Sequence, residues 1–249
     1  LSFPYFSPSP GQSPGLTNMD VFGIALTDYF RDRFNGPLLL HNSYGEPEEM
    51  PVDVFFRTEE ELPGLEKFAL AACRGRILDV GAGAGSHARI LQDRGLDVTA
   101  LEISAAAARI IRDRGVDRVI RGDIMEYQGE KYDTLLLMMN GIGLVETLAG
   151  LRRFLRHARQ FLHPEGQLLM DSSDISYLYE DLPRPAHYYG EIRYRYEYQG
   201  LQGCWFGWLY VDQETLFETA RSEGWLMQVI YENDDDQYLA RLVMTETPR

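Results

Sequence analysis

The chain has 249 residues, 45% of them hydrophobic and 12% aromatic, which is enough to bury one large core with an accessory element and argues against intrinsic disorder. Its 38 acidic residues outnumber 24 basic ones, and the net charge of -14 disfavours a nucleic-acid substrate or an anionic membrane surface. Cys73 and Cys204 lie outside any CxxC spacing, so neither a disulfide framework nor a zinc site is predicted, and we expect a reducing, cytoplasmic setting.

The first quarter of the chain is predicted to form a cap. Residues 1–15 are rich in Pro, Ser and Gly and are expected to be a flexible arm. Apolar residues at steps of three and four predict a helix over 19–30, and Asn35-Gly36-Pro37 ends it. A loop-rich stretch is expected up to Pro63, followed by a helix over 65–73. We therefore assign residues 16–72 to an N-terminal helical cap or lid.

From residue 76 onward, strands and helices alternate. This alternation predicts a parallel sheet with helices on its faces. No apolar run is long enough to span a bilayer, and we expect no export signal. The expected strands are 76–80, 97–101, 118–120, 132–139 and 167–171, and the expected helices are 86–94, 104–114 and 146–162, the last ended by the turn 163–166.

The pattern changes after Pro185. Residues 191–198 and 204–211 show the alternating side-chain pattern of strands and flank the turn 199–203, so they predict an antiparallel hairpin. A helix is expected over 212–222, and 226–232 with 237–244 predict a second hairpin. The segment 175–210 is therefore expected to be an insertion that forms a wall of the substrate site.

The most informative segment is ILDVGAGAGSHARIL, residues 77–91, in which a strand runs into Gly81, Gly83 and Gly85 and then a helix. Glycines at such a turn allow a ligand to approach the backbone closely. Asp79 lies at the end of the strand, where the carboxylate would repel the pyrophosphate of a dinucleotide. The same carboxylate suits a ligand with an ammonium, a sulfonium and no phosphate, which describes S-adenosylmethionine.

Two further acids follow the next two predicted strands. Glu102 ends the second strand, where its oxygens can accept both ribose hydroxyls, and Asp123 follows the third, where it can accept from an adenine amino group. Because the carboxyl ends of parallel strands meet at one edge of a sheet, the three acids are expected to line one crevice.

With these residues the sequence resembles the class I S-adenosylmethionine-dependent methyltransferases, over about residues 70–174. The resemblance rests on DVGAGAG, Glu102, Asp123, the strand leading to Asn140, and FLHPEGQLLMD at 161–171. It implies a Rossmann-like, doubly wound α/β fold with a seven-stranded sheet whose last strand is antiparallel, with the methyltransferase domain at 73–249. It also implies donor-binding roles for Gly81, Ala82, Gly83, Gly85, Asn140 and Gly141 at the methionyl group, Glu102 at the ribose, and Ile103, Asp123 and Ile124 at the adenine.

Residues outside this motif are open to more than one interpretation. His41 and His187 are weak candidates for a general base, and none of the five histidines has metal-ligand spacing with another, so no metal site is predicted. Arg57 either pairs with the carboxylate of the donor or is solvated. The aromatic residues of 188–208 either pack onto the sheet, the favoured interpretation, or line an aromatic substrate pocket.

The sequence thus predicts methyl transfer from S-adenosylmethionine to a small-molecule acceptor. A nicotinamide-dependent Rossmann oxidoreductase and a nucleoside-binding module without turnover are the alternatives. The sequence leaves open the acceptor atom, the need for a base, and the oligomeric state.

Overall fold

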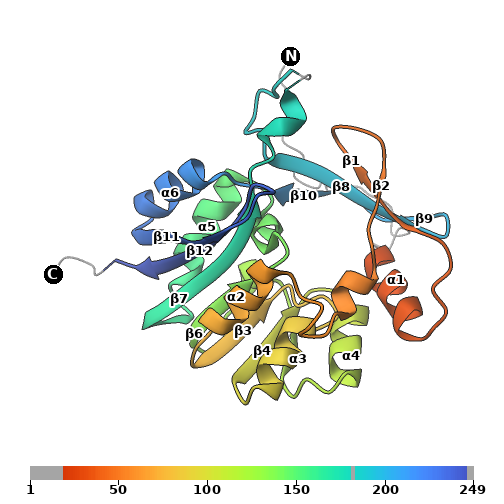
Figure 1. The fold of residues 1–249 in the computed structure, drawn as a ribbon, viewed down its shortest axis with the longest axis horizontal. Coiled ribbons are helices and arrows are strands. Elements are labelled where there is room, and N and C mark those ends of the chain that lie inside the picture. Colours follow the sequence, from red (N-terminus) through yellow and green to blue (C-terminus); the bar gives the residue numbers. More distant parts are fainter. Residues whose placement is uncertain (1–18, 181–182, 246–249) are drawn as a thin grey trace, which may run out of the picture.

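The computed structural model describes residues 19–180 and 183–245, so the predicted arm at 1–15 lies outside the described residues. These residues form two β-sheets with helices around the larger one (Figure 1). The larger sheet carries the predicted strand and helix repeat. The smaller sheet stands beside one end of it and joins segments from the first quarter and the last third of the chain.

The larger sheet has seven strands in the order β11-β12-β7-β6-β3-β4-β5. The pairs among β3 to β7 are parallel, and β12 is antiparallel to both β7 and β11. This confirms the predicted doubly wound sheet with an antiparallel strand at its end. The strands are β3 (Arg76–Val80), β4 (Asp97–Glu102), β5 (Val119–Arg121), β6 (Tyr132–Leu137), β7 (Leu162–Ser173), β11 (Trp225–Glu232) and β12 (Gln237–Met244).

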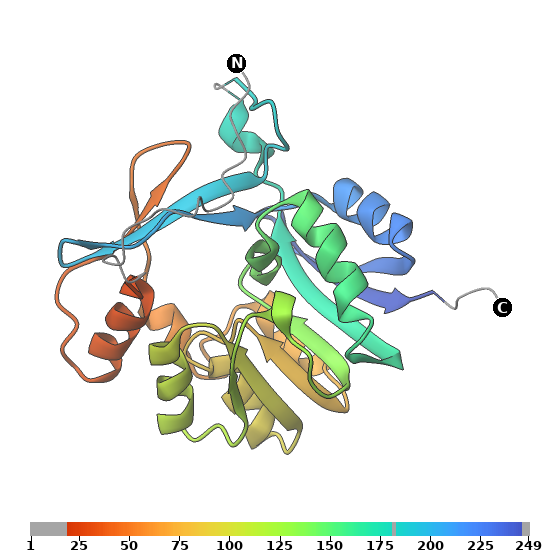
Figure 2. The same ribbon diagram turned by 180° about the vertical axis from the view of Figure 1, so that it is seen from behind.

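Helices cover both faces of this sheet (Figures 1 and 2). Consecutive residues of a strand point to opposite faces: Leu135 packs in the core with α5 (Leu148–Ala158) and α6 (Gln213–Ser222), whereas Leu136 packs in the core with α2 (Gly64–Ala72) and α3 (Ser86–Asp93). The helix α4 (Ala105–Asp113) contributes Ile111 to that second core. Because the central strand β6 is buried on both sides, its sequence contains the continuous apolar run 135–137.

The smaller sheet, which we call the second sheet, has the order β10-β8-β1-β2. It contains the predicted extra hairpin, β8 (Glu191–Tyr198) and β10 (Phe206–Leu209), with β9 (Leu201–Gln202) on β8. The expectation of a loop after residue 36 was wrong, because β1 (Leu38–Asn42) and β2 (Glu48–Glu49) are strands. β1 pairs with β8, about 150 residues away in the chain, so no local pattern identifies its partner.

Two boundaries differ from those predicted around the fourth crossover. The helix expected over 146–162 is shorter at both ends, because α5 spans Leu148–Ala158. A 3-10 turn, η3 (Gly141–Val145), precedes it, and the Thr147 side chain caps α5 by accepting from Gly150 N at 3.0 Å. Residues 163–166, expected as a turn, lie within the span of β7, and the pairing of β6 with β7 shifts register there.

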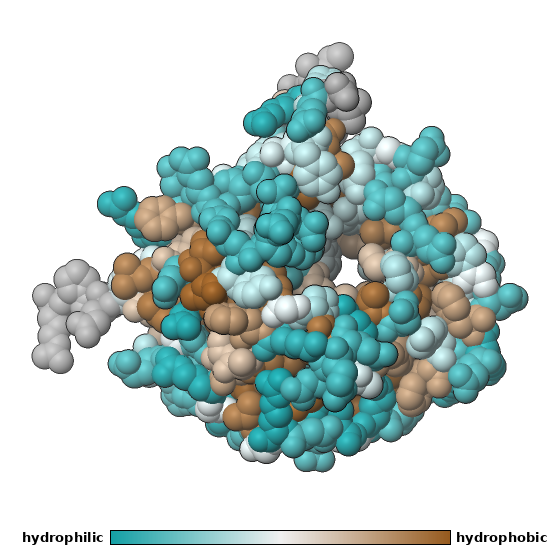
Figure 3. Space-filling view, viewed as in Figure 1, coloured by the Kyte–Doolittle hydropathy of each residue, from teal (hydrophilic) through white to brown (hydrophobic). Residues whose placement is uncertain are grey.

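The second sheet packs on the helices of the larger sheet through α1 (Val21–Phe30), which lies against α4. Leu26, Leu38 and Tyr198 are fully buried in a core shared with Ala107 and Ile110 of α4. The space-filling view shows a hollow where the second sheet meets the rest of the molecule (Figure 3). Within 19–180 and 183–245, we find no helix with the length and hydropathy needed to cross a bilayer.

Candidate active site

The glycine turn lies between β3 and α3, at the carboxyl edge of the larger sheet. Gly81, Gly83 and Gly85 have φ values of +70°, +57° and +83°, a region that favours glycine. The turn is tied to the next strand because Gly81 N donates to the carbonyl of Leu101 at 2.8 Å. The positive φ values confirm the prediction that these glycines make a tight turn.

Glu102 is the acid most directly connected to this turn. It is 5% exposed, and its Oε2 accepts from Gly83 N at 2.9 Å while Oε1 accepts from Ser104 N at 2.8 Å. Burial raises the pKa of Glu102 to about 7, against the opposing effect of the two backbone donors. The acid thus lies beside the turn and is bonded to its backbone at Gly83.

Asp79 is more deeply placed than the sequence analysis assumed. It is 2% exposed, and its Oδ2 accepts from Ala88 N of α3 at 3.1 Å. Burial raises its pKa, although the charge of His87 opposes that shift. The carboxylate therefore lies beneath the turn and also holds the first turn of α3 in place.

Asn140 and Gly141 follow β6, the parallel neighbour of β3, so they lie at the same edge of the sheet as the glycine turn. Asp171 of β7 holds both, with Oδ2 accepting from Asn140 N at 3.0 Å and Oδ1 from Gly141 N at 3.3 Å. Burial raises the pKa of Asp171 to about 6. Ser173 donates to Asn140 Oδ1 at 2.9 Å, and Asn140 has a φ of +53°. The segment is thereby fixed opposite the turn.

The predicted adenine side is formed by residues after β4 and β5. The Ile103 side chain is 60% exposed, and Ile124 is 4% exposed. Asp123 begins the short turn η2 (Ile124–Glu126) by accepting from Met125 N at 2.8 Å through Oδ1. Of these residues, Ile103 is therefore exposed and Ile124 is part of the core.

Phe55 covers the glycine turn from the N-terminal segment. A Cβ built on Gly83 would lie 3.2 Å from its ring. Arg114, after α4, fastens this cover: its Nη1 donates to the carbonyls of Ala84 at 2.7 Å and Phe55 at 3.3 Å, and its guanidinium lies over the ring of Phe56. Ser86 Oγ also donates to the carbonyl of Phe55, at 2.8 Å.

The aromatic face of the second sheet continues this cover. Tyr196 stacks on Phe22 of α1 at 5.2 Å and on Phe206 at 5.3 Å, and Phe22 meets Phe55 edge to face at 5.0 Å. A Cβ on Gly143 of η3 would overlap the indole of Trp208. The aromatic residues therefore extend from the glycine turn to the segment after Asn140, and they pack against one another.

Hydroxyl groups lie in the same aromatic cluster. Tyr194 and Tyr210 have their hydroxyl oxygens 3.2 Å apart, Tyr44 lies 3.4 Å from Tyr194, and Tyr44 donates to Glu48 at 2.8 Å. Burial raises the pKa of each of the three phenols above its ordinary range. The phenols are therefore neutral hydrogen-bonding groups at neutral pH.

Three residues singled out in the sequence lie in other surroundings. His41 is on the face of β1 opposite the aromatic cluster, and its Nε2 is 2.8 Å from Glu197 Oε2. His187 is exposed in the loop before β8. Arg57 donates to Glu66 Oε1 at 2.8 Å and to the carbonyl of Val54, and its side chain is 17% exposed, so it is already engaged within the protein.

The sequence analysis missed several residues that shape the site. Asp171 is the last residue of the predicted strand 167–171 and lies two residues before the end of β7, so the rule that singled out Asp79 and Glu102 would also have found it. Glu66, Phe55 and Arg114 give no comparable signal, because their roles depend on contacts with distant segments. Over the described residues, no group of three or more His, Cys, Asp or Glu side chains is arranged to hold a metal ion.

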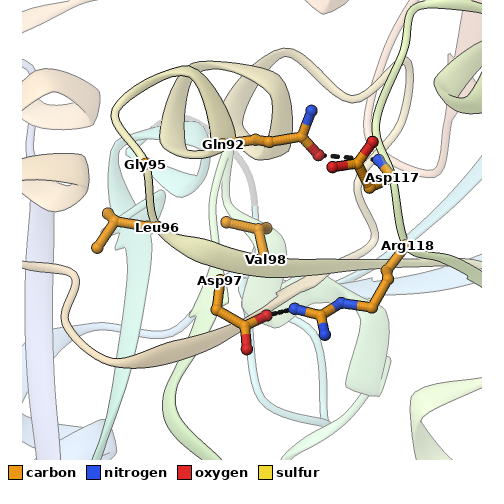
Figure 4. Close-up of a pocket in the computed structure, with 7 residues that line it drawn as sticks. All are labelled: Gln92, Gly95, Leu96, Asp97, Val98, Asp117 and Arg118. Carbon is orange, nitrogen blue, oxygen red and sulfur yellow. Dashed lines mark hydrogen bonds and ion pairs between the residues drawn. The ribbon is translucent and has the colours of Figure 1, made fainter.

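A separate pocket lies at the opposite edge of the larger sheet (Figure 4). It contains Asp97, the first residue of β4, paired with Arg118 just before β5. Ligands of open α/β sheets bind at the carboxyl ends of the strands, so the glycine-turn edge is the candidate active site.

Comparison with known proteins agrees with this geometry. Residues 78–170 match the family described as a methyltransferase domain. A solved S-adenosylmethionine-dependent methyltransferase from Bacteroides fragilis, in complex with S-adenosyl-L-homocysteine, is 38% identical, with 91% of this chain and 95% of that chain covered and a TM-score of 0.86. This chain belongs to the S-adenosylmethionine-dependent methyltransferases. S-adenosylmethionine is therefore its methyl donor, and the nicotinamide-dependent alternative is set aside.

More distant methyltransferase structures share the fold. The sugar N-methyltransferase KedS8 from Streptoalloteichus is 16% identical, covers 82% of this chain and 96% of its own, and has a TM-score of 0.56. CalS10, an amino pentose methyltransferase from Micromonospora echinaspora, is 17% identical, covers 81% of this chain and 100% of its own, and has a TM-score of 0.54. A search of curated proteins gave no match.

Proposed function

We propose that this methyltransferase acts on a small-molecule acceptor that binds between the glycine turn and the aromatic face of the second sheet. The observation that carries the proposal is the placement of that face, with Phe55 against Gly83 and Trp208 against Gly143. The wall is mostly apolar but carries the hydroxyls of Tyr194, Tyr196 and Tyr210, as expected of a small-molecule site with a few orienting polar groups.

The residues at the carboxyl edge of the larger sheet fit S-adenosylmethionine. The space above the glycine turn has no room for a side chain at Gly83, since a Cβ there would lie 3.2 Å from the ring of Phe55. We assign the methionyl group to Gly81, Ala82, Gly83, Gly85, Asn140 and Gly141, the ribose to Glu102, and the adenine to Ile103, Asp123 and Ile124. We do not assign Arg57 to the donor carboxylate, because the Arg57 guanidinium already donates a hydrogen bond to Glu66.

The chain's contribution to the reaction is orientation. The bound donor supplies an activated methyl group on a sulfonium. Glu102 fixes the nucleoside end, the Asn140–Gly141 segment fixes the other end, and Phe55 keeps water from the turn. Holding a nucleophile in line with an activated methyl can supply roughly 7–11 kcal/mol of the barrier. The acceptor atom loses its proton on forming the new bond, and a strong base is not required for an amine acceptor.

The second sheet and the segment 175–210 are proposed to form the acceptor side, with the methyltransferase domain at 73–249. Two proteins of the same fold are named for amino sugar or sugar nitrogen acceptors, which is in keeping with a small acceptor here. The net charge of -14 also favours a neutral or cationic acceptor over an anionic one.

The size of the acceptor can be tested directly. The protein is incubated with S-adenosylmethionine labelled in the methyl group and a bacterial cell extract, and the products are separated by ultrafiltration. We expect label in the low-molecular-mass fraction, where chromatography then identifies the acceptor, and none with the Gly83→Arg variant. Label that appears only on protein or nucleic acid would contradict a small-molecule acceptor.

A further inference from the structure

Near the glycine turn, Arg57 and His87 both form ion pairs with Glu66, and the charges of the buried carboxyl groups of Asp79 and Asp171 also act on His87. The site described above does not use all five side chains. His87 Nε2 lies 2.7 Å from Glu66 Oε2, and Arg57 donates to the other oxygen of Glu66 at 2.8 Å. Asp79 holds the backbone of Ala88, the neighbour of His87, and Asp171 holds Asn140 and Gly141. We call this set the buried charge cluster: Arg57, Glu66, Asp79, His87 and Asp171.

The cluster is assembled from separate elements. Glu66 comes from α2, Asp79 from β3, His87 from α3 and Asp171 from β7, while Arg57 follows η1 (Asp53–Phe56). Glu66, Asp79, His87 and Asp171 are each 7% exposed or less. Buried charges are stable only when they are paired or otherwise compensated, so the protonation state of His87 decides the balance of the cluster.

With His87 protonated, the three carboxylates face two cations, leaving one negative charge. We propose that His87 is a positioning residue of the donor site: as an imidazolium bonded to Glu66, it leaves the buried charge cluster with one net negative charge, which the ammonium group of the donor's methionyl end neutralises. This inference rests on the proposed placement of the donor. It concerns a residue that the sequence pattern marks only as the start of a helix.

Electrostatics within the cluster agree with this arrangement. Burial by itself lowers the pKa of His87, but the hydrogen bond to Glu66 and the charges of Asp79 and Asp171 raise it above its ordinary value. His87 in turn opposes the upward shift that burial gives to the pKa of Asp79 and Asp171. Removing the imidazolium would therefore raise the pKa of a neighbouring carboxyl group, which would keep its proton up to a higher pH.

The test is calorimetry with S-adenosylhomocysteine, comparing wild type with His87→Gln. At pH 7, in two buffers of different ionisation enthalpy, we expect the variant to release about one third to one half of a proton more than wild type, because the ammonium displaces the proton from a partly protonated carboxyl group. The affinity of the variant should fall about fivefold to tenfold at pH 6, because a proton then competes with the ammonium for the carboxylate. At pH 8.5 the carboxyl group has lost its proton, so the affinity should approach that of wild type.

Two controls separate positioning from a general loss of structure. His163→Gln changes a histidine at the start of β7, away from the cluster, and should behave as wild type. 5′-Methylthioadenosine lacks the amino acid end, so its affinity and proton release should be unchanged by His87→Gln. An equal weakening for both ligands at every pH, or no difference in proton release, would overturn the proposal.

A spectroscopic measurement covers the case in which His87→Gln does not fold. In wild-type protein labelled with ¹⁵N at histidine, one of the five imidazoles should remain an imidazolium at pH 8, and Glu66→Gln should convert it to the neutral form. Five neutral imidazoles at pH 8 would refute the inference. If wild type fails to bind S-adenosylhomocysteine at all, the donor placement fails instead.

Discussion

The donor side and the acceptor side that we propose for this methyltransferase are built in different ways. The donor side comes mainly from one stretch, residues 79–141, in which successive strands end at one edge of the larger sheet. The proposed acceptor side consists of β1, β8 and β10, where Leu40 pairs with Tyr196 across a long interval of sequence. The first region is determined by local backbone geometry, whereas the second depends on contacts between segments that are distant in sequence.

The two regions should therefore respond differently to substitution. Changes on the donor side should alter binding of S-adenosylhomocysteine, whereas changes on the acceptor side should leave that binding intact. The predictions below are ordered from the largest expected effect to the smallest, and each can contradict this division.

Replacing Gly83 by Arg should have the largest effect. Its φ is +57° and a Cβ would lie 3.2 Å from the ring of Phe55, so the longer side chain must enter the space above the turn. We expect the affinity for S-adenosylhomocysteine, measured by calorimetry, to fall by at least about 100-fold. Gly95→Arg is the matched control, because Gly95 also has a positive φ, +82°, but no atom lies within 4 Å of its Cβ. Equal losses in both variants would mean that backbone strain, not blocking, is responsible.

Glu102→Gln should have the next largest effect. Charge-assisted hydrogen bonds contribute about 1.5–3 kcal/mol, so losing the carboxylate should weaken S-adenosylhomocysteine about 10- to 100-fold. Glu126→Gln, at an exposed acid, is the control.

The same carboxyl group predicts a pH dependence. Burial raises the pKa of Glu102 to about 7, so lowering the pH through 7 protonates the group and removes the acceptor that the ribose hydroxyls need. The affinity should therefore fall from pH 8 to pH 6, and Glu102→Gln should flatten part of that fall. A wild-type affinity that is constant over this range would argue against Glu102 as the ribose ligand.

How far the sequence predicted each region follows from the same contrast. The period of the strands and helices, the glycine turn and the position of Glu102 depend on residues that are close in sequence, and these features were predicted correctly. β1 was missed because its hydrogen-bonding partner is β8. Arg57 was expected either to pair with the donor carboxylate or to be solvated, and neither interpretation included its bond to Glu66, which comes from another segment. Asp79 was located correctly at the strand end, but its burial depends on α3 covering it.

Arg114→Leu should have an intermediate effect on both stability and binding. The guanidinium joins the glycine turn at Ala84 to the cover at Phe55 and Phe56. Losing these bonds should lower the free energy of unfolding by about 1–3 kcal/mol in urea denaturation, and weaken S-adenosylhomocysteine about three- to tenfold as the cover loosens. Arg109→Leu, at an exposed position of α4, is the matched control and should change neither quantity appreciably.

Tyr210→Phe should have the smallest effect and tests the division most directly. It removes one hydroxyl of the pair with Tyr194 and leaves the aromatic ring in place. The free energy of unfolding should fall by about 0.5–1.5 kcal/mol, the value of a typical hydrogen bond, while binding of S-adenosylhomocysteine should stay within about twofold of wild type. Methyl transfer to the acceptor, once identified, should fall by more than donor binding does. If donor affinity falls as far as in Glu102→Gln, the second sheet is part of the donor site and the two regions are not separate.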